Sequence, residues 1–556
     1  MSSPSSFAGR TAVVLALALV AAGCHDKPLP RVKGTTLIAG KVRGLWVAPG
    51  GAAAATLVGA GPSNVKGAPS DLLLGSLTLT AVAGGAPRRL GGAVSNLPGS
   101  VLFTPDGQYL GFIAGYDVRS AMGELRLAKV SGGPPEVVAP RVTFFAFSPG
   151  GDQLAYVSDG DLFLRPAAQG PARRIASSVS LVEFGPPETP AAQTLFVHRT
   201  VRVDGALLSY DLSKGQLTAI ARGVERFRFS PAGDALAFVA AGLLAPGQVE
   251  APSIFGDKKP STPEAPGLYV RWGSGKPERL VADGAGEFRF SPVGHRLAYV
   301  TQPKGMATTG DLWVVDEHAA PRKVAIHVEQ LVFGADGSLA LLGAYLPSAE
   351  AGTLGILPRE GALFEVARSV RQFSVTPQGH ELLFLHGVMV GTSYALALSE
   401  RPLGAPEAVK PREIDDGVAG YTVDQTEKHL AYKARCLAAG RSCSLFVVDL
   451  TRPGPPVLVA THIAAFQFVP GEDQLVVVES RPAGKLSGKL LYSLALAPGE
   501  LPAGKPAPPL QLLDDDMTGD FALAGQDQRE VVYLVDEAGR TGLARAALPK
   551  LPSARR

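Results

Sequence analysis

The chain has 556 residues, several times the length of a typical domain of roughly 100–150 residues. Hydrophobic residues make up 46% of it, which excludes a chain that is disordered throughout. Lys and Arg number 53 against 50 Asp and Glu, so the net charge is +3 and no strong basic field indicates a nucleic-acid partner. With 65 Gly and 46 Pro the chain is rich in turns, and we expect few long helices.

An apolar run at residues 11–23 follows the single basic residue Arg10. This run is too short to span a membrane, because a transmembrane helix needs about 20 residues. Its length suits the apolar region of a secretory signal. We therefore expect residues 1–23 to be a signal peptide that is removed.

The apolar run ends in AAGC, whose last residue is Cys24. This sequence resembles the lipobox of bacterial lipoproteins, although Ala21 stands where Leu is more common. The resemblance implies cleavage before Cys24 and lipid on that cysteine, and two or more acyl chains anchor a protein stably. Residues 24–34 would then be a tether, and the protein would lie in the bacterial cell envelope, anchored by lipid at the outer membrane and facing the periplasm. The alternative is an ordinary signal with an incidental cysteine, which would give a soluble secreted protein.

One segment recurs along the chain. It reads FSPGGDQLAYV at residues 147–157, FSPAGDALAFV at 229–239 and FSPVGHRLAYV at 290–300. Weaker copies lie at residues 103–113, 333–343, 375–385, 423–433 and 468–478, with degenerate ones near Trp46, Phe184 and Phe521. The leucines that follow the turns are mostly 41–48 residues apart, and we count about eleven units.

Each unit reads as four short strands. In the sixth unit residues 288–290 alternate between apolar and polar, and a turn with Pro and Gly reverses the chain into residues 297–300. Residues 312–316 and 322–326 supply the third and fourth strands. Four antiparallel strands repeated about every 40–45 residues are typical of a β-propeller blade, so the sequence predicts an all-β fold.

The repeated segment resembles the WD-like repeats of the TolB β-propeller family, whose units carry a similar F-S-P-D-G turn followed by an apolar strand. The resemblance extends from residue 35 to the C-terminus. It implies the fold rather than an activity, because the shared residues are turn and core positions.

The number of units bears on the number of rings. Propellers typically have about 4–8 blades, so eleven units predict two tandem propellers. We place the first at residues 35–325 and the second at 326–556, and a boundary near residue 283 is the alternative. Residues 35–40 read as an outer strand without the rest of its blade, and we expect them to complete a distant blade and remove an exposed edge.

Histidines and acidic runs could suggest metal sites. His295, His380 and His429 stand in the hairpin turns of three different units, and we expect such turns to lie far apart. Because zinc needs three or four ligands at about 2 Å, we predict polar turn residues and no metal site. The acidic runs at residues 514–516, with Asp520 nearby, and 413–416 could bind calcium, but neither has EF-hand spacing, and we expect solvated linkers between blades.

Cys436 and Cys443 lie between two strands of one unit. In a protein that leaves the cytoplasm, this spacing favours a disulfide within one loop. Two free thiols or a metal pair are the alternatives, but with 3 cysteines in the chain no further pair exists to complete a metal site.

We find no catalytic motif in the sequence. A hydrolase domain of the kind that accompanies propellers in the prolyl-oligopeptidase family needs G-x-S-x-G, and residues 391–395 read GTSYA. Residues 273–277 read GSGKP and lack the first Gly and the Ser or Thr of a phosphate-binding loop. We therefore expect a protein that is not an enzyme and that uses no cofactor.

The fifth unit carries a long insertion at residues 240–266. It combines several prolines with the apolar Ile254 and Phe255 and the basic Lys258 and Lys259. Long loops on rigid scaffolds often carry function, so we predict that this insertion contacts a partner protein in the envelope. A tolerated insertion without a role is the alternative.

These observations lead to two hypotheses of function. The first is a lipid-anchored, non-catalytic β-propeller of the cell envelope that serves as a protein-binding scaffold. The second is a propeller enzyme or small-ligand-binding protein with a site in the central channel. Carboxylates or histidines that converge at one channel mouth would favour the second hypothesis, and an apolar or mixed rim would favour the first.

Overall fold

The computed structural model describes residues 33–549 apart from 64, 66–67, 200–204, 245–265, 274, 276, 283–284, 302–308, 391–392, 437–442, 452–453, 481–488, 497–509, 526 and 538–539. The regular structure of the described residues is β-strand, apart from the short 3-10 helix η1 (Pro190–Gln193). In this part of the chain no helix is long and apolar enough to cross a membrane. The protein is therefore all-β, as the sequence predicts.

The strands of the described residues group into sets of four, which we call units 1 to 11. Strands β2 (Val42–Val47), β3 (Ala53–Pro62), β4 (Leu73–Ala81) and β5 (Arg88–Ser95) form unit 1. Unit 2 consists of β6 (Val101–Phe103), β7 (Tyr109–Asp117), β8 (Met122–Lys129) and the first part of β9 (Glu136–Phe147), and unit 3 of the rest of β9 with β10 (Gln153–Ser158), β11 (Asp161–Pro166) and β12 (Arg173–Ala176). Unit 4 consists of β13 (Val179–Phe184), β14 (Thr194–Arg199), β15 (Ala206–Asp211) and β16 (Gln216–Arg222), with the short β19 (Gly242–Leu243) paired to β16. Unit 5 consists of β17 (Arg226–Phe229), β18 (Ala235–Ala240), β20 (Gly267–Trp272) and β21 (Glu278–Ala282), and unit 6 of β22 (Ala285–Phe290), β23 (Arg296–Thr301), β24 (Gly310–Asp316) and β25 (Arg322–Val328).

Units 7 to 11 follow the same plan. Unit 7 consists of β26 (Gln330–Phe333), β27 (Leu339–Leu346), β28 (Ala351–Leu357) and the first part of β29 (Phe364–Val375), and unit 8 of the rest of β29 with β30 (Glu381–Val390), β31 (Ser393–Pro402) and β32 (Arg412–Asp415). Unit 9 consists of β33 (Val418–Val423), β34 (His429–Ala434), β35 (Cys443–Asp449) and the first part of β36 (Val457–Phe468), and unit 10 of the rest of β36 with β37 (Gln474–Ser480), β38 (Lys489–Ala495) and the first part of β39 (Gln511–Ala524). Unit 11 consists of the rest of β39 with β40 (Glu530–Glu537), β41 (Arg540–Ala547) and, from the start of the chain, β1 (Thr35–Ala39).

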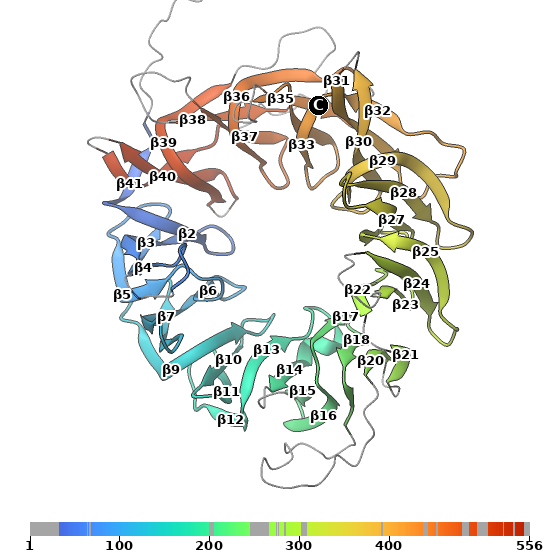
Figure 1. Ribbon diagram of the computed structural model, residues 1–556. Coiled ribbons are helices and arrows are strands. Elements are labelled where there is room, and N and C mark those ends of the chain that lie inside the picture. Colours follow the sequence, from blue (N-terminus) through green and yellow to red (C-terminus); the bar gives the residue numbers. More distant parts are fainter. Residues whose placement is uncertain are drawn as a thin grey trace, which may run out of the picture.

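Four long strands, β9, β29, β36 and β39, belong to two units each. In β9, for example, Val137 and Ala139 pair with β8, Val142 pairs with both β8 and β10, and the residues from Phe144 pair with β10. Arg141, between the two halves, has φ +51°, and this left-handed residue marks the corner at which the strand changes partners. The outer strand of one unit thus continues directly into the inner strand of the next (Figure 1).

Apolar clusters join each unit to its neighbours and close one ring. The units lie around a single centre, with β2, β13, β17 and β22 on the inner side and β5, β12, β16 and β21 farther out (Figure 1). The predicted division into propellers at residues 35–325 and 326–556 is wrong, because Val300 and Leu312 of unit 6 share a buried cluster with Leu331 of unit 7. The alternative boundary near residue 283 fails in the same way, since Val270 of unit 5 and Phe288 of unit 6 also share a cluster.

The first strand of the chain completes the last unit. Strand β1 pairs antiparallel with β41, from Thr35 opposite Arg545 to Ala39 opposite Gly542. Leu37 and Ile38 are buried in a cluster with residues of β40, β41 and unit 1. The strand expected at residues 35–40 therefore closes the ring, and we call its contacts with unit 11 the closing seam.

Candidate functional site

The recurring F-S-P-x-G turn joins the first and second strands of a unit, and we call it the first turn. In unit 5 the Ser230 hydroxyl accepts hydrogen bonds from the backbone N–H groups of Asp234 (3.1 Å) and Ala235 (2.9 Å). It donates to Asp234 Oδ1 at 2.7 Å. Gly233 takes φ +68° and donates its N–H to the Ser230 carbonyl at 2.8 Å. Serine and glycine thus fold the turn locally and fix the residue at the Asp234 position.

Neighbouring first turns touch each other through ionisable side chains. His295 Nε2 of unit 6 lies 2.7 Å from Asp234 Oδ2 of unit 5, and its Nδ1 contacts Glu317 of its own unit. Hydrogen bonds to Glu317 and then Asp234 raise the pKa of His295 above its usual value. His380 Nδ1 of unit 8 likewise lies 3.2 Å from Glu427 Oε2 of unit 9. The expectation that such turns lie far apart is therefore wrong for adjacent units, although these histidines are polar turn residues as predicted.

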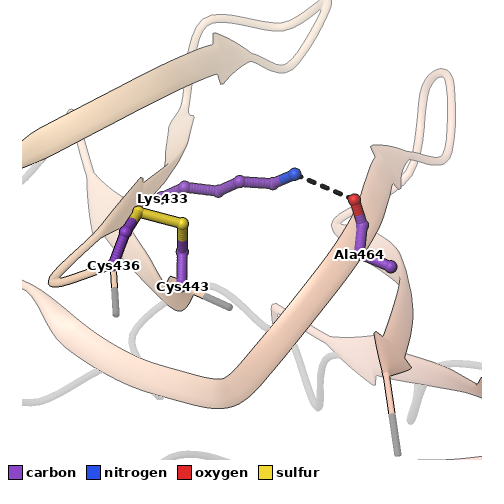
Figure 2. The surroundings of a disulfide bond; sticks show 4 residues. All are labelled: Lys433, Cys436, Cys443 and Ala464. Atoms are coloured by element: carbon purple, nitrogen blue, oxygen red, sulfur yellow. Dashed lines mark hydrogen bonds between the residues drawn. A yellow bond between two sulfur atoms is a disulfide. The ribbon is translucent and has the colours of Figure 1, made fainter. Parts of the chain in front are cut away.

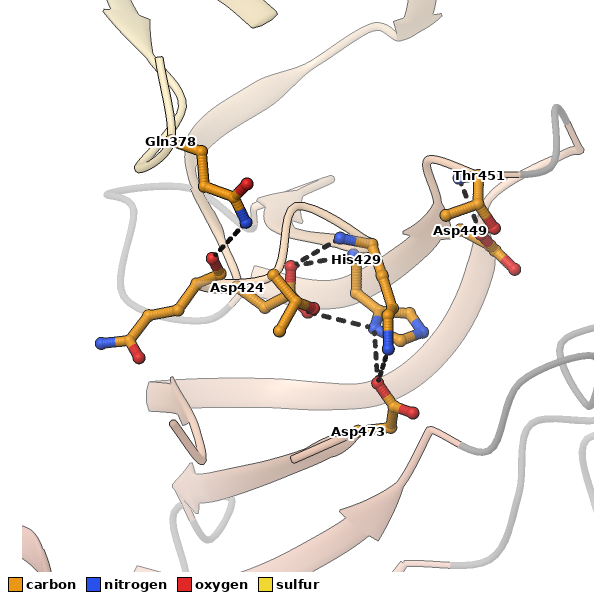
Figure 3. A network of polar contacts seen from close by, with 9 residues as sticks. Gln378, Asp424, His429, Asp449, Thr451 and Asp473 are labelled. Carbon is orange, nitrogen blue, oxygen red and sulfur yellow. Dashed lines mark hydrogen bonds and ion pairs between the residues drawn. The ribbon is translucent and has the colours of Figure 1, made fainter. Parts of the chain in front are cut away.

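We call the contact between two adjacent units a seam. The seam between units 9 and 10 brings two carboxylates to one imidazole nitrogen. His429 Nδ1 lies 3.4 Å from Asp424 Oδ2 in its own turn and 3.9 Å from Asp473 Oδ1 in the first turn of unit 10 (Figure 3). The side chains of Asp424 and His429 are each 4% exposed, and that of Asp473 is 18% exposed. Burial would raise the pKa of Asp424, but hydrogen bonds from His429 and Thr426 hold it below its usual value.

The seam between units 6 and 7 forms a polar cleft of about 350 Å³. His295, Arg296 and Glu317 of unit 6 line it together with Gly337 and Arg359 of unit 7. Arg296 is paired with Asp316 and donates to the Arg359 carbonyl at 2.9 Å. The Arg359 guanidinium is exposed and forms no ion pair with any described residue.

The seam between units 8 and 9 gathers like charges. Burial, followed by the nearby carboxylates of Glu400 and Glu427, raises the pKa of Glu381 to about 7. His380 and Arg412 oppose this rise. A carboxyl group with such a pKa in a polar seam can exchange a proton near neutral pH, which is also a property of many functional sites.

The acidic run at residues 514–516 is buried at the closing seam, so its predicted role as a solvated linker is wrong. Asp514 Oδ2 accepts hydrogen bonds from the Gly34 N–H (2.7 Å), from Arg540 Nη1 (2.7 Å) and from the Tyr533 hydroxyl. Arg540 Nη2 donates to the Gly34 carbonyl at 2.7 Å. Lys33 Nζ lies 2.7 Å from Asp516 Oδ2. These contacts hold the chain just before β1 against the last unit.

The other acidic run, residues 413–416, overlaps strand β32 of unit 8. Asp415 Oδ2 accepts a hydrogen bond from the Tyr432 hydroxyl of unit 9 at 2.7 Å. Burial, and after it this hydrogen bond, raise the pKa of Tyr432 above its usual value. This run therefore also belongs to a contact between units rather than to a free linker.

Cys436 and Cys443 are bonded, with an S–S distance of 1.99 Å (Figure 2). Cys443 opens strand β35 and pairs with Ile463 of β36. Close to the disulfide, Lys433 Nζ donates to the Ala464 carbonyl of unit 10 at 2.9 Å (Figure 2). The bond lies within one unit, and the link to the next unit is made by the lysine.

The other predicted site residues, Cys24, Ile254, Phe255, Lys258 and Lys259, lie outside the described residues. The start of the insertion is described, and it is fixed to the ring. Strand β19 (Gly242–Leu243) adds to the outer edge of unit 4 by pairing with β16. The Ala241 N–H also donates to the Arg222 carbonyl at 3.0 Å. The insertion therefore leaves the ring from a defined edge.

No sequence motif pointed to Asp424 and Asp473 as site residues. Two signals could have found them. Asp424 stands in the first turn of unit 9 where Ser148, Ser230 and Ser291 stand in other units. In the next unit, unit 10, Asp473 occupies the position that Asp234 has in unit 5. Neither signal points to a shared site unless it is known that the first turns of adjacent units touch.

No protein-family model matches the chain, and no curated protein matches it. Similar solved structures include the Dos1 propeller, 11% identical over 64% of this chain and 92% of that one, with a TM-score of 0.33. They also include dipeptidyl peptidase 4 of Porphyromonas gingivalis (11% identity, 72% and 65% covered, TM-score 0.36) and an oligogalacturonate lyase in complex with manganese (12%, 93% and 99%, 0.31). The first of these three structures is described as a propeller. With TM-scores of 0.31–0.36 and identities of 11–12%, these likenesses assign no activity and no residue role to this chain.

Proposed function

We propose that the protein is a lipid-anchored, non-catalytic scaffold of the bacterial cell envelope that binds a partner protein. The observation that carries this proposal is the attachment of the insertion in unit 5. Its first residues form β19 on the outer edge of unit 4, so residues 245–265 begin from a fixed point on the ring. A rigid base reduces the entropy that a loop loses when a partner orders it.

The composition of the insertion supports a protein partner. The regular residues of the units serve turns and core, so specificity is left to whatever departs from the repeat. Residues 245–265 are a long departure of this kind, and they bring Ile254 and Phe255 together with Lys258 and Lys259. Apolar side chains beside basic ones suit a protein surface with an apolar pocket and acidic neighbours.

A loop replacement tests the partner role. Residues 245–265 are replaced by a short hairpin containing Gly, with β19 kept, and partners are recovered from the native envelope after cross-linking. We expect the melting temperature of this variant to be unchanged and the partner no longer to be recovered with it. The matched control replaces residues 497–509, another Pro-rich segment between strands, and should recover the partner normally. Equal recovery by both variants, or turnover of any substrate by the purified protein, would contradict the proposal.

The proposed anchor fits the closing seam. Lys33 is held by Asp516, and Gly34 is held by Asp514 and Arg540. The residues from Cys24 to Lys33 can span at most roughly 30 Å, so lipid on Cys24 would keep this seam close to the membrane. Cys24→Ala should move the protein from the detergent phase to the aqueous phase in a phase-partitioning assay, or leave an uncleaved precursor. Unchanged partitioning would remove the anchor from the proposal.

A second candidate function is binding of a small anion, favoured by the cleft between units 6 and 7. Arg359 lines it with no ion pair among the described residues, whereas both ring nitrogens of His295 are already paired with Asp234 and Glu317. Citrate and inorganic phosphate, titrated calorimetrically, are suitable probes for this guanidinium. Arg359→Gln should abolish their binding, whereas Arg368→Gln, at an exposed arginine already paired with Glu365, should not. No binding to the wild type would reject this candidate.

A further inference from the structure

We propose that the seam between units 9 and 10 binds one divalent transition-metal ion, such as Zn²⁺, through Asp424 Oδ2, His429 Nδ1 and Asp473 Oδ1. The three ligand atoms lie within 4.8 Å of one another. They come from the first turns of two adjacent units (Figure 3). The ion would therefore add a link between two units that already share strand β36 and an apolar cluster.

The distances at this seam are long for hydrogen bonds and suit metal ligands. A good N–H···O hydrogen bond has its heavy atoms about 2.7–3.2 Å apart. His429 Nδ1 lies 3.4 Å from Asp424 Oδ2 and 3.9 Å from Asp473 Oδ1. Ligands bonded tetrahedrally to zinc at about 2.1 Å are about 3.4 Å apart, close to the shorter of these distances. An imidazole nitrogen carries at most one proton and can donate to one of the two carboxylates, whereas a metal ion binds all three atoms.

The Asp424 carboxylate is oriented before any ion arrives. Its Oδ1 accepts the backbone N–H groups of Lys428 (2.8 Å) and His429 (3.1 Å). These are the two positions whose N–H groups bond to the serine hydroxyl in the first turn of unit 5. Aspartate thus replaces serine in the turn and keeps a second oxygen, Oδ2, which faces His429 and also accepts from Thr426 Oγ1 at 2.7 Å. Such outer hydrogen bonds fix the orientation of metal ligands.

The charge at the seam matches a divalent ion. Two carboxylates with a neutral imidazole carry a charge of −2, and one divalent cation neutralises it. Lys428 Nζ, 3.5 Å from Asp473 Oδ1, is the nearby cation, and its side chain is 47% exposed. It can swing into solvent when an ion binds, so it acts as a competitor and not as a barrier.

The other turn histidines lack this arrangement. His295 contacts Asp234 and Glu317 through opposite ring nitrogens, which cannot bind one ion together. His380 contacts the single carboxylate of Glu427, and its side chain is 62% exposed. Among the described first turns, the one with Asp424 is therefore the one that combines a buried histidine with two carboxylates on one nitrogen.

The test uses the tag-free full chain, freed of metal with a chelator and titrated with Zn²⁺ by calorimetry. We expect one ion per chain and a higher melting temperature in its presence. Asp473→Asn, which leaves the turn of unit 9 intact, should weaken binding at least about tenfold and abolish the rise in melting temperature. Lys428→Ala should tighten binding, because it removes the competing cation. The matched control Asp234→Asn, at the seam between units 5 and 6, should bind as the wild type does.

Three results would overturn the site. They are no saturable binding by the wild type, equal binding by wild type and Asp473→Asn, and equal weakening by Asp473→Asn and Asp234→Asn. If Asp473→Asn does not fold, the Lys428→Ala variant decides: unchanged or weaker binding contradicts the site, and tighter binding supports it.

Discussion

The closing seam and the seam between units 5 and 6 place charge differently. At the closing seam the Asp514 side chain is 0% exposed and that of its partner Arg540 is 11% exposed. At the seam between units 5 and 6 the side chains of His295 and Asp234 are 36% and 35% exposed. Exposed ion pairs contribute little to stability, whereas a buried charge that loses its partner is costly. The closing seam therefore depends on its charges far more than the seam between units 5 and 6 does.

Chain connectivity explains this difference. Units 5 and 6 follow each other in the chain, so the backbone already keeps them close. Strand β1 and strand β41 lie at opposite ends of the chain, and only their own contacts hold them together. Apolar clusters occur at both seams. The buried contacts of Asp514 with Gly34, Tyr533 and Arg540 are the additional feature of the place where the backbone gives no connection.

The largest effect is expected from Asp514→Ala. It leaves the buried Arg540 guanidinium and the Gly34 N–H without their acceptor, which should cost roughly 3–5 kcal/mol. We expect a much lower melting temperature by calorimetry and faster trypsin cleavage near Lys33. Asp520→Ala is the matched control, because Asp520 is exposed on the same strand β39. Equal melting temperatures for the two variants would show that the closing seam does not depend on its buried charge.

An internal seam can carry charge that opposes folding. Burial and the carboxylates of Glu400 and Glu427 raise the pKa of Glu381 from 4.5 to about 7. The folded protein then binds more protons than the unfolded chain between these values, so stability falls as the pH rises from about 4.5 to 7. Glu381→Gln should remove this fall and gain roughly 2–3 kcal/mol at pH 8, with little change near pH 4.5.

Melting curves from pH 4.5 to 8 measure this effect. Glu365→Gln serves as the control, since Glu365 is 47% exposed and pairs with Arg368. If the wild-type stability stays level across this range, or if Glu381→Gln gains no stability at pH 8, the charged Glu381 carboxylate does not oppose folding.

The disulfide tests whether stability and ring closure can be separated. Cys436 and Cys443 close a loop within unit 9 and cross no seam. In the chain-entropy account, replacing both by Ser should cost about 2–3 kcal/mol through the unfolded state. We expect a lower melting temperature but unchanged trypsin cleavage near Lys33, in contrast to Asp514→Ala. Alkylation of both thiols in the wild type without reductant would contradict the bond itself.

The recurring turn and the alternating strands made much of the fold predictable. Residues 35–40 could be placed in a distant unit because they read as an outer strand with no blade of its own. The number of rings was not predictable in this way. The angle between units depends on the packing of side chains such as Leu312 against Leu331, and the repeat spacing carries no information about it.

The contacts between units were hidden from the sequence for a similar reason. A period of about 40–45 residues identifies equivalent positions but not the distance between them in space. His295 and Asp234, and likewise His429 and Asp473, meet because adjacent first turns touch. The acidic run with Asp514 looked solvated because its partner Arg540 and the chain around Gly34 lie far away in the sequence.

The smallest effect is expected at the seam between units 5 and 6, where His295→Gln removes an exposed ion pair. Hydrogen bonds that His295 donates to Glu317 and Asp234 raise the pKa of His295 above 6.5 in the folded state. The pair therefore stabilises the protein fully below pH 6.5, while the carboxylates remain charged, and this contribution is lost as the pH rises through the raised pKa. Because both groups are about one third exposed, we expect less than about 1 kcal/mol. Melting temperatures should differ most near pH 6 and converge by pH 8.5. His380→Gln, at a more exposed histidine with one carboxylate partner, should change less at every pH. A loss from His295→Gln as large as that from Asp514→Ala would remove the distinction between internal and closing seams.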